Sequence, residues 1–186
     1  INGAECEPCL TTDRRIMHDH PEELLHGIAY LMRACRAERA IIAVEANKQD
    51  AADTLRKAIP EAAPVTLEVL RVKYPQGAEK MLIKALLERE VPSRGLPADV
   101  GVLCINVATA AEIGLLLPHG AGIQERVITV GGPGIKKKGN YRIPIGTPLR
   151  FVLDTVGFED DLARLFLGGP MMGQSVSSLD IPVTKR

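Results

Sequence analysis

The sequence is poor in aromatic side chains and has no net charge. Its 186 residues include no Trp, three Phe and three Tyr, and 23 basic residues balance 23 acidic ones. Proteins that bind nucleic acids usually attract phosphates with a positive field and stack bases on aromatic rings. This sequence offers neither feature, so we expect no nucleic-acid partner.

Long hydrophobic runs are also absent. No stretch of the sequence approaches the ~20 apolar residues of a membrane-spanning helix. The start INGAEC lacks the basic and apolar regions of a signal peptide. We therefore expect a cytoplasmic chain. Because the sequence has no initiator Met and ends openly in IPVTKR, we expect a fragment of a longer protein.

Cysteine is scarce, with four residues in all. Cys35 lies in a helical pattern and Cys104 in an apolar run, where buried free thiols are common, so we expect no disulfide framework. Cys6 and Cys9 form a C-x-x-C pair, but a cluster needs about four ligands and no second pair completes the set. We expect no metal or redox role for this pair.

The residues that are present alternate between helical and strand patterns up to about residue 120. Buried strands have continuous apolar runs, and amphipathic helices place apolar residues three or four positions apart. Helical patterns start at residues 20, 47, 77 and 108, and strand patterns cover 40–45, 65–72 and 100–107. This alternation predicts an α/β fold, with a parallel sheet and helices on both faces.

The pattern changes after residue 120, where we place a boundary between domains 1–120 and 121–186. The second part is predicted to be a small α+β unit, with two strands, a helix starting near Thr147, a glycine-rich loop and a final strand. The run from Lys136 to Asn140 is predicted to be a solvated hairpin tip with its turn at Gly139-Asn140; docking to an acidic partner or anionic lipid is the alternative. Met171 and Met172 are expected to fill gaps in a core.

Three short stretches carry side chains suited to binding. Ligands of parallel α/β sheets bind beyond the carboxyl ends of strands, where Asn2, Glu5 and Glu7 are expected, although loop carboxylates are most often simply solvated. Gly77 stands at the mouth of a helix, where it leaves room for a ligand, and Glu79 falls in the first turn.

The third stretch is VGVLCINVATAAEIG, in which an apolar run gives way at once to a helix of small residues. Asn106 and Thr109 straddle the turn. Backbone N–H groups at a helix N-terminus together with a Thr hydroxyl suit a phosphate. The same residues also suit a plain helix cap, so both interpretations stay open here.

Six segments taken together resemble the RnfC family, which supplies one of the subunits of the Rnf ion-translocating electron-transport complex. They are INGAECEPCLTTDRRIM, KYPQGAEKMLIKALLEREVP, INVATA, GNYRIPIGTPL, LGGPMMG and DIPVTK, and their order and spacing match along nearly the whole chain. More distantly, the chain is similar to the NADH-binding flavoprotein subunit of respiratory complex I, in which the first segment contains N-A-D-E-S-E-P-G.

The resemblance implies a Rossmann-like domain that binds FMN and NADH, followed by a β-grasp domain of the soluble-ligand-binding type. By motif, Asn2, Glu5, Glu7 and Glu79 would line the flavin and nicotinamide site, with Gly77 beside them. Asn106 and Thr109 would hold the FMN phosphate. The sequence departs from the complex I pattern at Ala4, Ala78 and Ala108, each of which stands where that relative has an acid.

The function implied is electron transfer between NADH and iron–sulfur centres through FMN, in a complex on the inner face of the cell membrane. Other subunits and ferredoxin would be partners. The family's glycine-rich flavin loop is expected before residue 1 and its iron–sulfur segments after residue 186, so residues 1–186 alone are expected to be inactive. A flavin-dependent cobalamin reductase and a non-catalytic assembly module are the alternatives.

Overall fold

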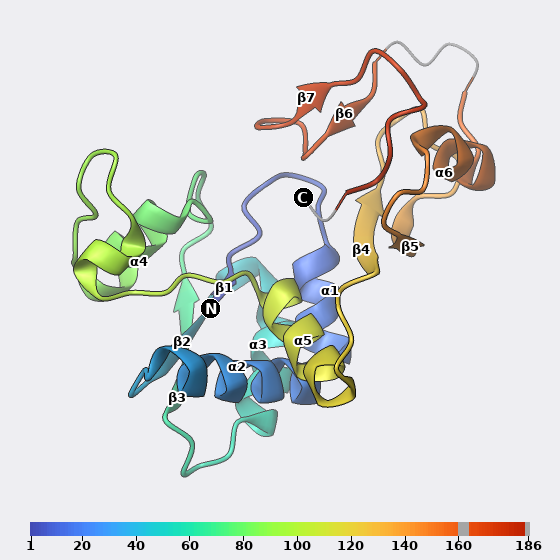
Figure 1. Cartoon of the computed structure of the whole chain (residues 1–186). Helices are drawn as coiled ribbons and strands as arrows, with labels where there is room; N and C mark the ends of the chain where they lie inside the picture. The colour runs from blue at the N-terminus through green and yellow to red at the C-terminus, as the bar shows by residue number, and fades with distance from the viewer. Residues whose placement is uncertain (160–163, 185–186) are drawn as a thin grey trace. The chain divides into compact units, whose positions relative to one another are not determined.

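The chain, as a computed structural model, is described for residues 1–159 and 164–184 and divides into two compact units (Figure 1). The first unit contains Ile1–Cys6 and Asp13–Gly122, and the second contains Glu7–Thr12 and Ile123–Arg186. A short segment from the beginning of the chain therefore belongs to the second unit. Among the described residues, no helix has both the length and the apolar composition that crossing a membrane requires.

The first unit is built around a parallel sheet with strand order β1-β2-β3. Its elements in chain order are β1 (Asn2–Gly3), α1 (Thr12–Asp19, which starts on the last residue of the Glu7–Thr12 segment), α2 (Pro21–Cys35), β2 (Ala40–Glu45), η1 (Ala46–Lys48), α3 (Gln49–Ala58), β3 (Val65–Leu70), α4 (Glu79–Leu87), η2 (Pro97–Val100), α5 (Val107–Leu116) and η3 (Leu117–His119).

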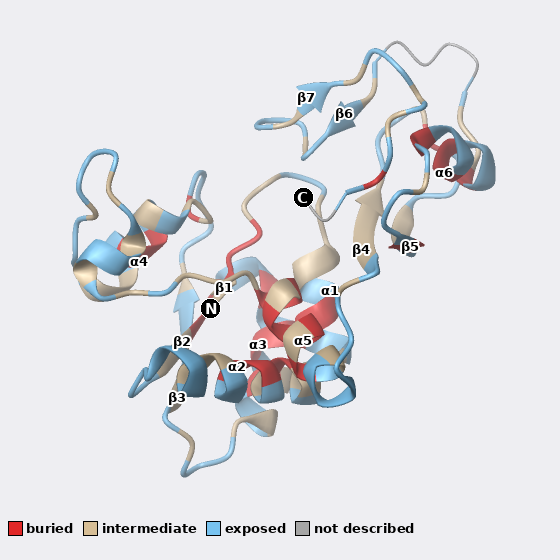
Figure 2. Ribbon diagram, viewed as in Figure 1, coloured by how far each residue is buried: buried red, intermediate tan, exposed pale blue. Residues whose placement is uncertain are grey.

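Both faces of β2 are covered. Its last four residues, 42–45, are all buried, and successive residues of a strand point to opposite faces of the sheet. The prediction of a parallel sheet packed between helices is confirmed. Figure 2 shows the buried stretches of α1, α2 and α5, which hold much of the core of the first unit.

Helices α2 and α5 approach each other closely at two glycines. A Cβ atom on Gly27 would lie 1.8 Å from the carbonyl oxygen of Ala110, and one on Gly114 would lie 1.8 Å from that of Glu23. Only residues without a Cβ fit at this distance. The two glycines thus set how closely α2 packs against α5.

The strand expected over residues 100–107 was wrong. η2 ends at Val100, and residues 102–105 follow without strand pairing; the sheet is joined only by a bridge between Asn2 and Asn106 and by the Asn2 N–H, which donates to Ile105 O at 2.7 Å. The physical reason is the length of the neighbouring strand. β1 has two residues, so it cannot pair with a longer strand on its free side.

The second unit contains two small antiparallel sheets and one helix. Its elements are β4 (Glu125–Val130), β5 (Gly139–Pro144), α6 (Leu149–Val156), β6 (Phe166–Leu167) and β7 (Gln174–Ser175). Ile143, Leu149, Val152 and Val183 form a core between β5, α6 and the last described residues. This agrees with the small α+β unit that the sequence predicts.

The Glu7–Thr12 segment joins the second unit through polar contacts. The Thr11 N–H donates to Thr129 Oγ1 at 3.2 Å, and the hydroxyls of Thr12 and Thr129 are 2.8 Å apart. Asn140 donates from Nδ2 to Thr11 O at 3.3 Å and accepts from the Thr129 hydroxyl at 2.8 Å. The segment is therefore fixed to β4 and β5 by side chains rather than by strand pairing.

Three local predictions in the sequence need correction. Gly139 and Asn140 are not a turn, because they begin β5 and pair with Val130 and Thr129; the three lysines before them are exposed, as expected. Met171 and Met172 do not fill a core, since 56% and 68% of their surfaces are exposed. Cys35 is exposed rather than buried, because it lies in the last, solvent-facing turn of α2.

Candidate functional site

The carboxyl end of β1 gathers most of the residues that the sequence singles out. Asn2 connects its parts: Asn2 Nδ2 donates to Gly77 O at 2.9 Å, and Asn2 Oδ1 accepts from the Ala4 N–H at 3.1 Å. The bridge between Asn2 and Asn106 joins the same strand to the start of α5. Asn2, Gly77 and Asn106, which are far apart in the sequence, are thus brought together.

Gly77 lies in residues 74–78, which lead into α4 and are called the site loop below. A Cβ atom on Gly77 would lie 2.2 Å from Ala4 O and 3.1 Å from Cys6 Sγ, so only glycine allows the loop to lie against β1. Glu79 follows as the first residue of α4 and is exposed. The loop thereby places an accessible carboxylate at the start of a helix.

Asn106 caps α5. Its Oδ1 accepts from the Ala108 N–H at 2.8 Å, and its Nδ2 donates to Asp13 Oδ2 at 2.7 Å. This is the cap that the sequence left open as one of two interpretations. Thr109 is half-buried in the first turn of α5, and its hydroxyl makes no hydrogen bond within the described part of the chain. Thr109 is the side chain of this turn with donor capacity left for a ligand.

Glu5 is buried at the N-terminus of α1 rather than solvated in a loop. Only 9% of its surface is exposed, and its carboxylate accepts from the N–H groups of Asp13 at 3.0 Å and Arg14 at 3.5 Å. The first N–H groups of a helix have no partner within the helix and carry partial positive charge. Glu5 supplies the missing acceptor, which gives it a structural role whatever else it binds.

We expect Glu5→Ala to lower the free energy of unfolding by about 1–2 kcal/mol, the usual cost of losing a helix cap. Glu5→Gln keeps an acceptor oxygen and should lose less. Glu79→Ala is the matched control, because Glu79 is exposed and its removal should change stability by less than about 0.5 kcal/mol. Urea unfolding followed by circular dichroism measures all three. Equal stability of the Glu5→Ala and Glu79→Ala variants would contradict the capping role.

Three helix N-termini lie around this end of β1. Glu5 holds the first turn of α1, Asn106 bridges to both α1 and α5, and the site loop opens α4. Helix N-termini favour anions because their unpaired N–H groups and the helix dipole act together. The acids Glu5 and Asp13 already use part of this field, so a bound anion would rely on the free amides at the start of α5.

Glu7 belongs to the second unit. Its carboxylate accepts from the backbone N–H groups of Met172 at 2.7 Å and Met171 at 3.1 Å. Gly169 makes this contact possible, because a Cβ atom there would lie 2.5 Å from Glu7 Oε2. Glu7 therefore fixes the glycine-rich loop between β6 and β7.

The cysteines are free thiols, Cys6 half-buried and Cys9 exposed. Burial raises the pKa of the Cys104 thiol, and the charge of Glu79 raises it further, so this sulfur stays protonated and is a poor metal ligand. In residues 1–159 and 164–184, no three His, Cys, Asp or Glu side chains are grouped so as to hold a metal ion.

Sequence reasoning missed several polar residues of the first unit. Asp13 had a signal, since TTD before RRIM is typical of a helix start, but that helix is short. Glu45 and Gln76 are buried and had no signal, because nothing in a sequence distinguishes a buried Glu or Gln from an exposed one.

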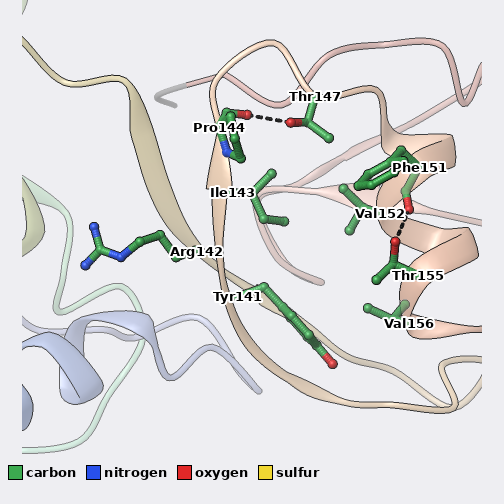
Figure 3. A pocket seen from close by; sticks show the side chains of 9 residues that line it. All are labelled: Tyr141, Arg142, Ile143, Pro144, Thr147, Phe151, Val152, Thr155 and Val156. Atoms are coloured by element: carbon green, nitrogen blue, oxygen red, sulfur yellow. Dashed lines mark hydrogen bonds between the residues drawn. The ribbon is translucent and has the colours of Figure 1, made fainter.

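A separate hollow of about 160 Å³ lies in the second unit between β5 and α6 (Figure 3). Its walls are mostly apolar, with Ile143, Val152 and Val156 among the lining residues. Its hydroxyl groups are used internally: Thr147 donates to Pro144 O at 2.8 Å and Thr155 to Phe151 O at 2.7 Å. The hollow therefore offers little to orient a polar ligand.

A parallel sheet with polar side chains and helix N-termini at the carboxyl end of one strand has the arrangement of α/β ligand-binding domains. Residues 1–115 match the family of the Nuo51 FMN-binding domain, and residues 127–175 match the SLBB domain. Because the first match covers more than half of the sequence, the chain belongs to the Nuo51 FMN-binding domain family. The second match agrees with the β-grasp domain implied by the sequence.

Curated relatives match over the whole chain, and each is a subunit of a membrane complex. The chain is 42% identical to its relative in the proton-translocating ferredoxin:NAD(+) oxidoreductase complex of Clostridium ljungdahlii and 43% identical to that in the Na(+)-translocating ferredoxin:NAD(+) oxidoreductase complex of Acetobacterium woodii. It is also 42% identical to that in the ion-translocating oxidoreductase complex of Pasteurella multocida. All 186 residues align in each case, but they span only 40%, 42% and 22% of these relatives. The resemblance to the RnfC family is confirmed.

The fold is also found in solved structures. Crystal structures of an NAD+-reducing NiFe-hydrogenase in the air-oxidized and H2-reduced states match with TM-scores of 0.77 and 0.81. They are 23% and 20% identical in sequence, and the matches cover 98% and 99% of this chain and 37% of each matched chain. At this identity the likeness concerns the fold alone.

Proposed function

We propose that this chain is part of a flavoprotein subunit that passes electrons between NADH and iron–sulfur centres through FMN. The observation that carries the proposal is the convergence of Asn2, Gly77 and Asn106 at the carboxyl end of β1. A flavin needs close backbone approach for its ring and free N–H groups for its phosphate. Gly77 and the first turn of α5 supply one of these each.

The phosphate is proposed to lie at the start of α5. Thr109 donates its free hydroxyl to a phosphate oxygen, and the first-turn amides donate beside it. Asn106 acts through its cap, because one of its two functional groups holds the Ala108 amide and the other holds Asp13. Asn106 therefore shapes the turn, with at most one N–H left for the ligand.

The remaining residues are proposed to face the ring and the nicotinamide. When bound, FMN accepts a hydride from NADH and releases electrons one at a time. Asn2 holds the site loop through Gly77 O, Glu5 fixes α1, and exposed Glu79 is free to accept hydrogen bonds from a sugar or ring N–H. We leave Glu7 out of this site, because its carboxylate is engaged by Met171 and Met172.

The whole protein is proposed to work within a larger assembly. Relatives are named as subunits of ion-translocating complexes that act on ferredoxin and NAD(+), which supports other subunits, ferredoxin and NADH as partners. We propose a peripheral position on the inner face of the membrane, and iron–sulfur clusters held by parts of the protein outside residues 1–186.

Thr109→Val removes the free hydroxyl without changing the shape of the side chain, and we expect it to weaken FMN binding by the full-length protein about tenfold. Combining it with Asn106→Ala should weaken binding further. Thr54→Val is the matched control, since Thr54 is exposed on α3 and its hydroxyl bonds Asp50 O. Quenching of flavin fluorescence on titration gives the affinities. Equal affinity of the Thr109→Val and Thr54→Val variants would place the phosphate elsewhere.

Catalysis tests the proposal as a whole. The full-length protein with FMN bound should reduce an artificial one-electron acceptor with NADH as donor. Absence of turnover in a flavin-loaded preparation would favour a non-catalytic role. Reduction of cobalamin in place of the artificial acceptor would instead favour a cobalamin reductase on the same scaffold.

A further inference from the structure

Two buried polar side chains in the first unit have no hydrogen-bond partner within the described residues. Glu45 ends β2 with 1% of its surface exposed, and neither of its carboxyl oxygens is bonded. Gln76, in the site loop, is 2% exposed, and its Nε2 is unbonded. Leaving a buried polar group unpaired usually costs about 1–3 kcal/mol, so such groups need an explanation.

The two side chains are complementary, because an amide nitrogen donates hydrogen bonds and a carboxyl oxygen accepts them. They also adjoin the same residue. The Gln76 N–H donates to Lys73 O at 3.0 Å, and the Lys73 amide lies close enough to Glu45 to favour its carboxylate form. Both therefore lie at the carboxyl ends of β2 and β3, beneath the turn that leads to Gly77.

We propose that Glu45 and Gln76 form a buried latch, in which Gln76 Nε2 donates to the Glu45 carboxyl and holds the site loop in place. The Ala78 N–H, which donates to Pro75 O at 3.0 Å, closes the turn held by this latch. Gly77 and Glu79 depend on it for their positions, so Glu45 and Gln76 are positioning residues. Their effect on a flavin rests on the proposed function, whereas the latch itself does not.

The charge state of Glu45 follows from its surroundings. Burial raises the pKa of Glu45, and the Lys48 ammonium, 4.0 Å from Oε2, and the Lys73 amide offset this only in part. Lys48 is the charged side chain that acts on Glu45 within the described residues, and it also donates to Asn47 Oδ1 at 3.3 Å. Either form of the carboxyl keeps an acceptor oxygen, so the latch holds with or without the proton.

Hydrogen exchange of the full-length protein without flavin tests the latch directly. Exchange of the Gln76 and Ala78 amides reports opening of the site loop. Glu45→Met and Gln76→Met should each speed this exchange about tenfold, because each removes a hydrogen bond to a charged or polar buried partner. Glu45→Gln keeps the acceptor and should restore slow exchange. Glu68→Met, an exposed acid on neighbouring β3, is the control and should change nothing.

The double variant Glu45→Met with Gln76→Met decides whether the two residues act together. If they form one latch, the double variant exchanges no faster than either single variant. Effects that multiply in the double variant, or single variants that exchange like wild type, would overturn the proposal.

A pH profile separates the latch from a merely structural role. Gln76→Glu places a second carboxyl against Glu45, and two such groups can share one proton but cannot both ionise without repulsion. Exchange of the Ala78 amide in this variant should stay slow at low pH and accelerate as pH rises through the raised pKa of the pair. Wild type should show only the ordinary pH dependence of amide exchange. Identical profiles would overturn the latch.

Flavin titration of the same variants distinguishes failure of the latch from failure of the proposed function. Faster exchange together with about tenfold weaker FMN binding supports both. Faster exchange with unchanged FMN affinity supports the latch and overturns its role at a flavin site. If wild type itself binds no FMN, the proposed function fails, and the exchange data alone judge the latch.

Discussion

The Gly77→Ala variant of the full-length protein is expected to lose FMN binding by at least about a hundredfold, more than any other single change at this site. The added Cβ would lie 2.2 Å from Ala4 O and 3.1 Å from Cys6 Sγ, whereas ordinary contacts are 3.4–4 Å. The first of these atoms belongs to the backbone of the loop after β1 and cannot rotate away. The site loop must therefore move off β1 by more than an ångström.

That movement would break the hydrogen bond from Asn2 Nδ2 to Gly77 O and displace Glu79 at the start of α4. Binding sites tolerate displacements of this size poorly, because their groups act at fixed distances. Gly122→Ala is the control: nothing lies within 4 Å of its added Cβ, and its backbone is not left-handed. Flavin fluorescence gives the affinities, and circular dichroism checks that both variants fold. A Gly77→Ala variant that binds FMN like the control would remove the loop from the site.

Those parts of the fold that depend on local pattern could be predicted from the sequence. β2 and β3 are short β-branched runs, and α2, α3 and α5 have helical spacing or small residues behind a plain start. Asn106 was recognised as a turn residue because Asn before a helix is a common cap. In each case the signal lies within a few residues of the structure that it predicts.

The failures involve partners that are distant in the chain. Helix α1 has Ile16 and Met17 as its only buried residues, too few to reveal a period, and its N-terminus depends on Glu5 outside the helix. Residues 100–107 have the composition of a strand, but the strand beside them is two residues long and cannot pair further. Burial pattern alone does not say whether an edge is available.

The candidate site shows the same division. Glu5 and Glu7 are two residues apart in one motif, and the sequence assigned them one role. The structure gives them different partners, the α1 amides for Glu5 and the Met171 and Met172 amides for Glu7. A motif fixes which residues are close in the chain, whereas the hydrogen-bond acceptors and donors that they meet are set by the fold.

The largest loss of stability is expected for Gly27→Ala, at the contact between α2 and α5. Alanine is favoured over glycine inside a helix by about 1 kcal/mol, so the helix alone would be stabilised. The added Cβ, however, would lie 1.8 Å from Ala110 O and 2.7 Å from Ala110 C. Overpacking usually costs about 1–3 kcal/mol and more when backbone atoms collide, so we expect a net loss of at least about 2 kcal/mol.

Urea unfolding measures this loss, and His26→Ala is the control, because His26 is the exposed neighbour on the same helix and should change stability by less than about 0.5 kcal/mol. The Gly114→Ala variant should resemble Gly27→Ala, since its Cβ would lie 1.8 Å from Glu23 O. Both clashes are relieved by the same separation of α2 from α5. The double variant should therefore lose clearly less stability than the sum of the single losses. Additive losses would mean that each glycine is accommodated by a local change in its own helix rather than by a movement of the pair.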